Sequence, residues 1–312
     1  MTHYTIGVDI SKAHLDAHRL PDGEARQFSN DKRGMKAFIG WIGEGALERI
    51  VYEPTGAYHR SFQETLSAAG LPIARVNPLQ ARRFAQACGA RAKTDKADAR
   101  SLAAMGQALQ PQLYTVPSEK LRDLKELQVV RQALIKDATA AKNRQKSLSL
   151  PLPKKQNTLR LRQIERDLKA VEKAMCELVA DDTAMARTFE IVCSIPGIST
   201  ITALILLAEI PELGTLHSKQ IAAMAGLAPF NRDSGQWKGK RFIGSGRKHL
   251  RHALYLPALV ASRFNADLKA KYTQLIDAGK PAKVGLTAIM RKLIILANAL
   301  VKADRKWVDK MA

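Results

Sequence analysis

The sequence has few of the residues that build disulfide frameworks, zinc sites or membrane spans. Its 312 residues include only 3 cysteines, Cys88, Cys176 and Cys193, which are widely spaced. An odd, scattered set provides neither a disulfide framework nor a zinc site, so we expect reduced thiols in the core. No apolar run reaches the roughly 18 residues of a membrane span, and segment 1–18 lacks a basic stretch followed by an apolar one. These absences favour a cytosolic protein with no membrane partner.

Acidic residues are also scarce relative to basic ones. The chain has 50 Lys and Arg against 29 Asp and Glu, which gives a net charge of +21. Residues 183–312 carry 20 basic and 8 acidic residues, a balance of +12. Basic side chains that neutralise phosphates release condensed counterions, so this excess favours nucleic acid as the partner. Ribosomal or anionic-membrane binding would need a similar charge and stays open at this point.

Glycine is missing from the middle of the chain, between Gly106 and Gly197. Segments 118–150 and 154–195 can therefore run as helices, with the Pro-Leu-Pro step at 151–153 breaking them into a hairpin. Apolar residues recur there at three- and four-residue spacing, as in an antiparallel coiled coil or in plain bundle packing. They are Leu121, Leu124, Leu127, Val130, Leu134, Leu161, Ile164, Leu168, Val171, Met175 and Leu178. The basic face of these helices is either a solvated surface or a nucleic-acid contact.

The first third alternates short β-like runs with helical stretches. Segments 5–9, 14–20 and 24–28 predict an antiparallel meander, and segments 49–53 and 72–76 predict strands of α/β units. Helices are expected over 32–41, 58–69 and 78–88. This order predicts an α/β domain with an RNase H-like sheet.

Four carboxylates occupy positions where chain segments could end beside a metal ion. Asp9 closes one apolar run and Glu53 another, while Asp95 and Asp98 lie three apart on one helix face. Hard cations such as Mg²⁺ prefer carboxylate oxygens, and an ion pair held by such groups can clamp both oxygens of a phosphodiester displacement. Taken singly, each acid is also explained as a cap, a turn residue or part of a solvated face. The neighbouring Lys93, Lys96 and Arg100 could hold phosphate or form surface ion pairs.

The last third contains two further segments of interest. Segment 195–210 looks like a helix-hairpin-helix element, in which free N–H groups after a glycine turn hold a DNA phosphate. Segment 228–252 is a glycine-rich basic loop followed by a helix, and it contains Ser234 and Ser245, each before a glycine. Serine before glycine is ordinary turn chemistry. The surrounding cations could neutralise a phosphorane-like transition state: Lys238, Lys240, Arg241, Arg247, Lys248 and Arg251.

Several motifs together carry a resemblance to a known family. Gly7-Val-Asp9-Ile-Ser-Lys12, Tyr52-Glu53-Pro-Thr-Gly-Ala-Tyr58, Val76-Asn-Pro78 and Lys93-Thr-Asp95-Lys-Ala-Asp98-Ala resemble the DEDD transposases of bacterial insertion sequences, relatives of the Piv DNA invertases. Ile195-Pro-Gly197 and Gly226-Leu-Ala-Pro229 extend the resemblance over almost the whole chain. It implies a RuvC-like domain at 1–117, a helical hairpin or coiled-coil arm at 118–182 and a mostly α-helical transposase domain at 183–312.

The resemblance also implies roles for individual residues. Asp9, Glu53, Asp95 and Asp98 would bind Mg²⁺ or Mn²⁺, and Ser234 would attack the DNA phosphate. On local grounds, and not from the resemblance, Ser245 competes with Ser234, and Tyr255 is a further residue to test. The implied partners are target and donor DNA, a noncoding bridge RNA, and further copies of the chain in a homodimer or homotetramer at the nucleoid. A Piv-type invertase, a junction-resolving nuclease without a covalent intermediate, and a noncatalytic nucleic-acid-binding protein remain alternatives.

Overall fold

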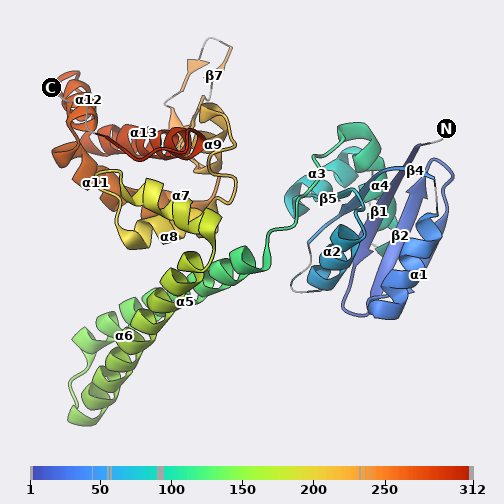
Figure 1. Ribbon diagram of the computed structural model, residues 1–312, viewed down its shortest axis with the longest axis horizontal. Coiled ribbons are helices and arrows are strands. Elements are labelled where there is room, and N and C mark those ends of the chain that lie inside the picture. Colours follow the sequence, from blue (N-terminus) through green and yellow to red (C-terminus); the bar gives the residue numbers. More distant parts are fainter. Residues whose placement is uncertain are drawn as a thin grey trace. The chain divides into compact units, whose positions relative to one another are not determined.

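The chain divides into two compact units, Met1–Val116 and Pro117–Ala312 (Figure 1). The computed structural model describes residues 3–43, 45–54, 56, 58–89, 95–231, 233–235, 237–239 and 241–308, without the side chains of 95–97 and 238. Each unit has its own apolar core. The finer division into three domains stays a prediction, because the helical arm packs within the second unit.

The first unit is built on a mixed five-stranded sheet of order β3-β2-β1-β4-β5. Its strands are β1 (His3–Ile10), β2 (His14–Leu20), β3 (Ala25–Ser29), β4 (Ala46–Tyr52) and β5 (Ile73–Arg75). The first three form an antiparallel meander, whereas β4 pairs parallel with β1 and β5 parallel with β4. The predicted meander followed by α/β units is confirmed, and the arrangement is compatible with an RNase H-like domain. Asp9 lies inside β1 rather than at its last residue.

Helices cover both faces of this sheet. They are α1 (Lys32–Ile42), α2 (His59–Ala68), α3 (Pro78–Ala87) and α4 (Asp95–Leu109). On one face, Ile6 and Val8 of β1 are fully buried in a core that includes Phe38 of α1 and Phe62 of α2. The other face is covered by α4. Side-chain alternation along β1 therefore separates an aliphatic face, which holds the core, from the face that carries Thr5, Gly7 and Asp9.

Helix α4 lies unusually close to β1, because both elements carry a glycine at the contact. A Cβ atom on Gly7 would lie 2.1 Å from the carbonyl oxygen of Ala99, and one on Gly106 would lie 2.5 Å from Cγ2 of Thr5. Gly106 thus lies over Thr5 and Ala99 over Gly7, so α4 runs antiparallel to β1. The first residues of α4 consequently lie toward the carboxyl end of β1.

The second unit begins with a helical hairpin of α5 (Glu119–Ser147) and α6 (Pro151–Ala180), as predicted (Figure 1). The prediction of a single helix over 154–195 was wrong. α6 ends at Ala180, and α7 (Thr183–Cys193) begins after Asp182, whose side chain accepts a 2.9 Å hydrogen bond from the Met185 amide. An aspartate cap thus starts a new helix without glycine or proline. Of the predicted apolar seam, Leu124 and Met175 are fully buried, but Val130 is exposed.

The remaining helices form a second core around α13 (Ala282–Lys302). They are α8 (Thr200–Glu209), α9 (Ser218–Met224), α10 (Lys248–Ala253), α11 (Tyr255–Phe264) and α12 (Ala266–Asp277). Of the described helices, α13 is long and apolar enough to cross a membrane by length and composition, and half of its apolar window is buried inside the protein. Ile289, Leu293 and Ala297 of α13 are fully buried among the other helices. α13 therefore serves as the central core helix of this unit.

The expectation of three core thiols was wrong for Cys88. This residue follows α3, a helix with no buried residue among those described, and its side chain is exposed. Cys176 and Cys193 are free and partly buried, and burial raises the pKa of both thiols, that of Cys193 to about 11. These two cysteines are therefore protonated at neutral pH and poorly reactive.

We expect Gly7→Ala to destabilise the protein by about 1–3 kcal/mol, because the added methyl group meets the α4 backbone and must push helix and strand apart. Gly40→Ala is the matched control. Gly40 lies in α1 with no atom within 4 Å of an added Cβ, so alanine there should be neutral or slightly stabilising. Urea unfolding of the three proteins measures both effects. Equal stability of the Gly7 variant and the parent would contradict the close contact.

Candidate active site

Asp9 lies in β1, and Glu53 directly follows the adjacent parallel strand β4. The last matched pair of β1 and β4 is Val8 with Tyr52, and each acid is the next residue along its strand direction. Two residues before the acids, Gly7 of β1 pairs with Val51 of β4, and this pair lies on the face that α4 covers. Alternation along β1 therefore directs Asp9 toward that same face, and Glu53 lies one residue beyond the end of β4. Both residues are half-buried.

Asp98 lies on the side of α4 that faces β4 and β5. It is four residues before Leu102, which packs with Val51, Ala74 and Val76 of these strands. Asp98 is also half-buried. Because α4 runs antiparallel to β1, its first turn lies toward the strand ends that carry Asp9 and Glu53. Asp95 is the first residue of α4, and its side chain lies outside the described part of the structure.

The structure adds a carboxylate that the sequence analysis missed. Asp16 of β2 is the cross-strand partner of Asp9, so the two side chains share the α4 face. Asp16 is only 5% exposed, and its Oδ1 accepts a 3.0 Å hydrogen bond from Gln27 Nε2. Two carboxylates directly opposite each other repel unless a cation lies near them. The alternation of Asp16 and His18 with apolar residues in β2 was the available signal, but only the strand register pairs Asp16 with Asp9.

The donor set at this edge of the sheet suits a hard cation. Asp9, Glu53, Asp98 and Asp16 offer carboxylate oxygens, the ligands that Mg²⁺ prefers. Within the described residues, however, no three acidic, histidine or cysteine side chains lie close enough together to hold a metal ion. The strand register places Asp9 beside Asp16 and one strand away from Glu53, but the described side chains do not form a coordination shell.

Of the basic residues predicted beside the acids, Arg100 is described and exposed on α4. Its charge acts on His18 of β2, whose pKa is lowered first by burial and then by repulsion from Arg100, against an opposing contribution from Asp22. Lys93 lies outside the described residues, as does the Lys96 side chain. Arg100 therefore adds positive charge on the α4 side of the sheet.

Ser234 lies on an exposed β-ribbon of the second unit (Figure 1). Strands β6 (Pro229–Phe230) and β9 (Phe242–Ile243) pair, and nested within them β7 (Asp233–Ser234) pairs with β8 (Trp237–Lys238). Gly235 follows Ser234 with a φ of 57°, a conformation that favours glycine. Ser234 is thus the last residue of its strand before the turn, with its side chain open to solvent.

Arg247 and Arg251 have structural partners within the second unit. Both terminal nitrogens of Arg247 bind Glu212, at 2.9 and 2.8 Å, and Nη1 also donates to the Glu209 carbonyl. Arg251 donates to the carbonyl of Ser245 at 2.9 Å. The pairing of Arg247 with Glu212 is bidentate, the strongest arrangement for an arginine and a carboxylate. These two arginines therefore hold the base of the ribbon.

The other predicted site residues of this unit differ in exposure. Arg241 and Lys248 are exposed, as is Tyr255 at the start of α11. Ser245 has a positive φ of 49° in a turn beside Gly246, where an added Cβ would lie 2.4 Å from the Gly226 amide nitrogen. Lys240 and the Lys238 side chain lie outside the described residues.

The glycine turn of the predicted helix-hairpin-helix element joins α7 to α8. Gly197 has a φ of 100°, and a Cβ there would lie 2.8 Å from the carbonyl oxygen of Pro257 in α11. Ser199 caps α8 by accepting from the Thr202 amide. Close packing and capping therefore explain this turn, and phosphate binding by it stays a prediction.

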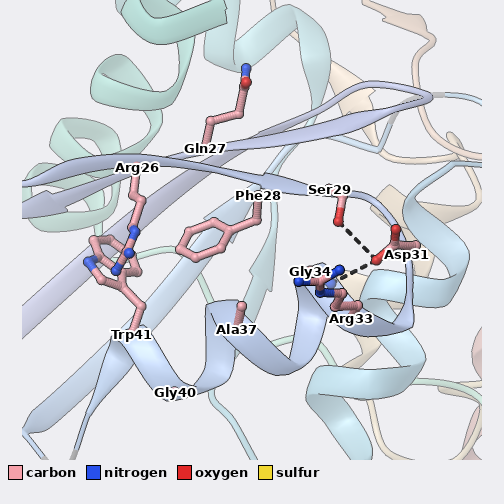
Figure 2. A pocket seen from close by; sticks show the side chains of 10 residues that line it. All are labelled: Arg26, Gln27, Phe28, Ser29, Asp31, Arg33, Gly34, Ala37, Gly40 and Trp41. Carbon is pink, nitrogen blue, oxygen red and sulfur yellow. Dashed lines mark hydrogen bonds between the residues drawn. The ribbon is translucent and has the colours of Figure 1, made fainter.

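A groove of about 570 Å³ lies between β3 and α1 (Figure 2). Arg26 and Trp41 lie at one end, and Asp31 and Arg33 at the other. Asp31 Oδ1 accepts from Ser29 Oγ at 2.9 Å and from the Gly34 amide at 2.7 Å, so this acid serves as the cap of α1. Among the described residues that line it, none belongs to the predicted site.

Comparisons with known proteins agree with this geometry. A family model for DEDD transposases of IS110 type, described as transposase, matches residues 6–149, and the model described as transposase of the IS116/IS110/IS902 family matches residues 189–273. The chain is 29% identical over 321 residues to the pilin gene-inverting protein of Moraxella bovis, and 30% identical over 321 residues to that of Moraxella lacunata. Each alignment covers 98% of both chains. The chain therefore belongs to the IS110 family of transposases.

Proposed function

We propose that the protein is an RNA-guided DNA recombinase that moves an insertion sequence by cutting and rejoining DNA strands. A bridge RNA would choose target and donor DNA by base pairing, while the protein contacts duplex shape and backbone. The observation that supports the strand-cutting part of the proposal is the placement of Asp9, Glu53 and the first turn of α4 toward one edge of the sheet. Membership of a transposase family agrees with DNA as the substrate.

In this proposal, the acidic edge holds divalent metal through Asp9, Glu53, Asp95 and Asp98, with Asp16 beside them. Bound Mg²⁺ would stabilise the charge that develops on the phosphate oxygens. The α4 N-terminus contributes a partial positive charge at the same place, which favours a cluster of carboxylates. Mn²⁺ has the same preference for oxygen ligands and would be expected to substitute.

Ser234 would supply the nucleophile. Its Oγ loses a proton and forms a bond to phosphorus, while one phosphorus–oxygen bond of the DNA strand breaks and the departing sugar oxygen takes a proton. A hydroxyl of another strand then displaces the serine and restores the phosphodiester. Each step exchanges one phosphate ester for another, so rejoining needs no external energy source. The exposed end of β7 suits such an attack, because a DNA phosphate can approach it from solvent.

The helical hairpin is the proposed dimerisation device and RNA surface. Large apolar side chains stay exposed along it, among them Val129, Leu152 and Leu159. Burial of such groups between protomers would stabilise a homodimer or homotetramer. The composite site would then combine the acids of one protomer with the serine of another. An RNA and DNA substrate implies a location at the nucleoid.

A second candidate function is site-specific DNA inversion. It is favoured by the two relatives named as pilin gene-inverting proteins, which align over almost the full length of the chain. An invertase would use the same residues on a fixed pair of sites. A junction-resolving nuclease would need only the acids and water, and would leave no protein–DNA adduct. Genomic context separates the first two, since an insertion sequence occurs in many copies.

Asp9→Asn and Glu53→Gln should lower strand cleavage by at least about 100-fold, since loss of residues that merely orient metal ligands already costs about 10- to 100-fold. DNA binding should persist, because each change removes negative charge. Cleavage of junction DNA in Mg²⁺ and a gel-shift assay measure the two properties. Asp22→Asn is the control, since Asp22 pairs with Arg19 in the turn after β2. Full cleavage by both site variants would reject the acidic site.

Ser234→Ala should abolish the denaturation-resistant adduct between protein and DNA while folding and binding survive, because the hydroxyl is the proposed attacking group. Protein, flanking RNA, Mg²⁺ and junction DNA are incubated and resolved on a denaturing gel. Ser245→Ala and Tyr255→Phe are matched controls that also remove hydroxyl groups, and both should still form the adduct. An adduct with Ser234→Ala and none with either control would reassign the nucleophile.

Arg247→Ala should lower the free energy of unfolding by about 1–2 kcal/mol, a range discounted because Arg247 and Glu212 are both about a third exposed. Arg241→Ala, at an exposed cation, should leave stability unchanged and weaken DNA binding.

The stability that Glu212 contributes should depend on pH. Burial raises the pKa of Glu212, but the hydrogen bonds from Arg247 lower it by more, so the pKa lies below 4.5 in the folded protein. This stabilisation is present above pH 4.5 and is lost as the pH falls through the lowered pKa. Unfolding measured against pH tests the effect, and a pH-independent difference would contradict it.

A further inference from the structure

The ribbon that carries Ser234 presents large aromatic side chains to solvent. Trp237 is 61% exposed, while Phe230 and Phe242 are 43% and 41% exposed. Phe230 and Phe242 pair across β6 and β9 with ring centroids 6.0 Å apart. Aromatic side chains usually contribute to a core or an interface. The described core of the second unit is built by other residues, so burial within the protein does not explain these rings.

Trp237 is the cross-strand partner of Ser234. The two residues pair directly in the β7–β8 ribbon, so their side chains share one face, with Cβ atoms about 4.5–5.5 Å apart. A DNA phosphate that reaches the Ser234 hydroxyl therefore brings its adjacent nucleoside next to the indole ring. The group of that nucleoside with a flat π face is the base.

The charge around the ribbon specifies the class of ligand. Segment 229–252 contains 7 Lys and Arg residues against 1 Asp, and two of the seven, Arg247 and Arg251, hold the base of the ribbon. An apolar protein partner would not need such an excess of cations, whereas a nucleic-acid strand needs both cations for its phosphates and aromatic rings for its bases. In a duplex the bases are stacked on one another, so a protein ring reaches a base face only where the strand is unpaired.

We propose that Trp237 stacks on an unpaired DNA base next to the phosphate that Ser234 attacks. The ribbon thereby binds single-stranded DNA at the exchange point and holds the strand in register with the hydroxyl. Trp237 is a strand-binding residue and takes no part in bond making. The inference rests on the proposed function only for the role of Ser234, because base stacking itself requires no cleavage.

The test compares two single strands of equal charge, without divalent metal so that no strand is cut. One is an oligothymidylate of about 20 nucleotides, longer than typical single-strand sites, and the other is an abasic strand of the same length. The full-length protein should prefer the base-bearing strand by at least about fivefold, the lower bound for one aromatic–base stack. Trp237→Ala should lose this preference and keep its affinity for the abasic strand. Trp237→Phe, which retains an aromatic face, should keep most of the preference.

Tryptophan fluorescence gives a second readout, because stacking on a base quenches the indole. The chain has 3 tryptophans. Trp41→Phe is the matched control, since Trp41 lies in the first unit and its Nε1 donates to Glu24 at 2.7 Å. Oligothymidylate should quench the tryptophan fluorescence of the parent and of Trp41→Phe, but not that of Trp237→Phe. An exposed ring contributes little to stability, so thermal unfolding of Trp237→Ala and Trp237→Phe should match that of the parent.

Three outcomes decide the proposal and separate it from the role of Ser234. Equal affinity of the parent protein for both strands, or an unchanged preference in Trp237→Ala, overturns the stacking role. If Ser234→Ala then still abolishes the adduct, the proposed nucleophile stands without it. A base preference that depends on Trp237 supports the inference even where Ser234→Ala still forms an adduct, in which case only the nucleophile is misassigned.

Discussion

The close approach of α4 to β1 is the constraint on which the acidic edge depends. Gly7 and Gly106 remove the side chains that would hold helix and sheet apart, and the helix backbone lies directly on the strand. Since α4 runs antiparallel to β1, its N-terminus reaches the strand ends that carry Asp9 and Glu53. Carboxylates placed opposite each other, as Asp9 and Asp16 are, repel. The partial positive charge of the helix N-terminus offsets part of that repulsion and leaves a place that favours cations.

The ribbon in the second unit differs from the acidic edge, because its base is fixed while its end is exposed. Its base is fixed by charged hydrogen bonds, with Arg247 held by Glu212 and Arg251 by the Ser245 carbonyl. Its end carries Ser234 and Trp237 into solvent. In the proposed mechanism, a hydroxyl that attacks a bulky polymer would gain from such exposure, whereas carboxylates that hold metal would gain from a rigid sheet. Of the predicted DNA-binding cations, Arg247 and Arg251 thus explain the shape of the loop, and exposed ones such as Arg241 remain for phosphate contact.

The sequence predicts which segments form helices and strands better than it predicts which residues lie side by side in the fold. Period-two alternation and helix signals located the sheet strands, and the Pro-Leu-Pro step located the hairpin between α5 and α6. The break at Asp182 was missed because a capping aspartate looks like any solvated acid. Asp16 was missed because its place beside Asp9 depends on strand register, which no local pattern encodes. Ser234 was proposed as the nucleophile only through family resemblance, since Asp-Ser-Gly by itself indicates a turn.

The acids and the serine belong to different compact units of the chain. Neither group suffices for strand exchange, since carboxylates without the hydroxyl form no covalent intermediate and an isolated serine hydroxyl is a weak nucleophile. If the acids and Ser234 act as we propose, catalysis needs a bound DNA strand to reach both groups, and the basic side chains of both units suit such binding. Coupling activity to assembly on the correct DNA would keep the free protein from cutting at random.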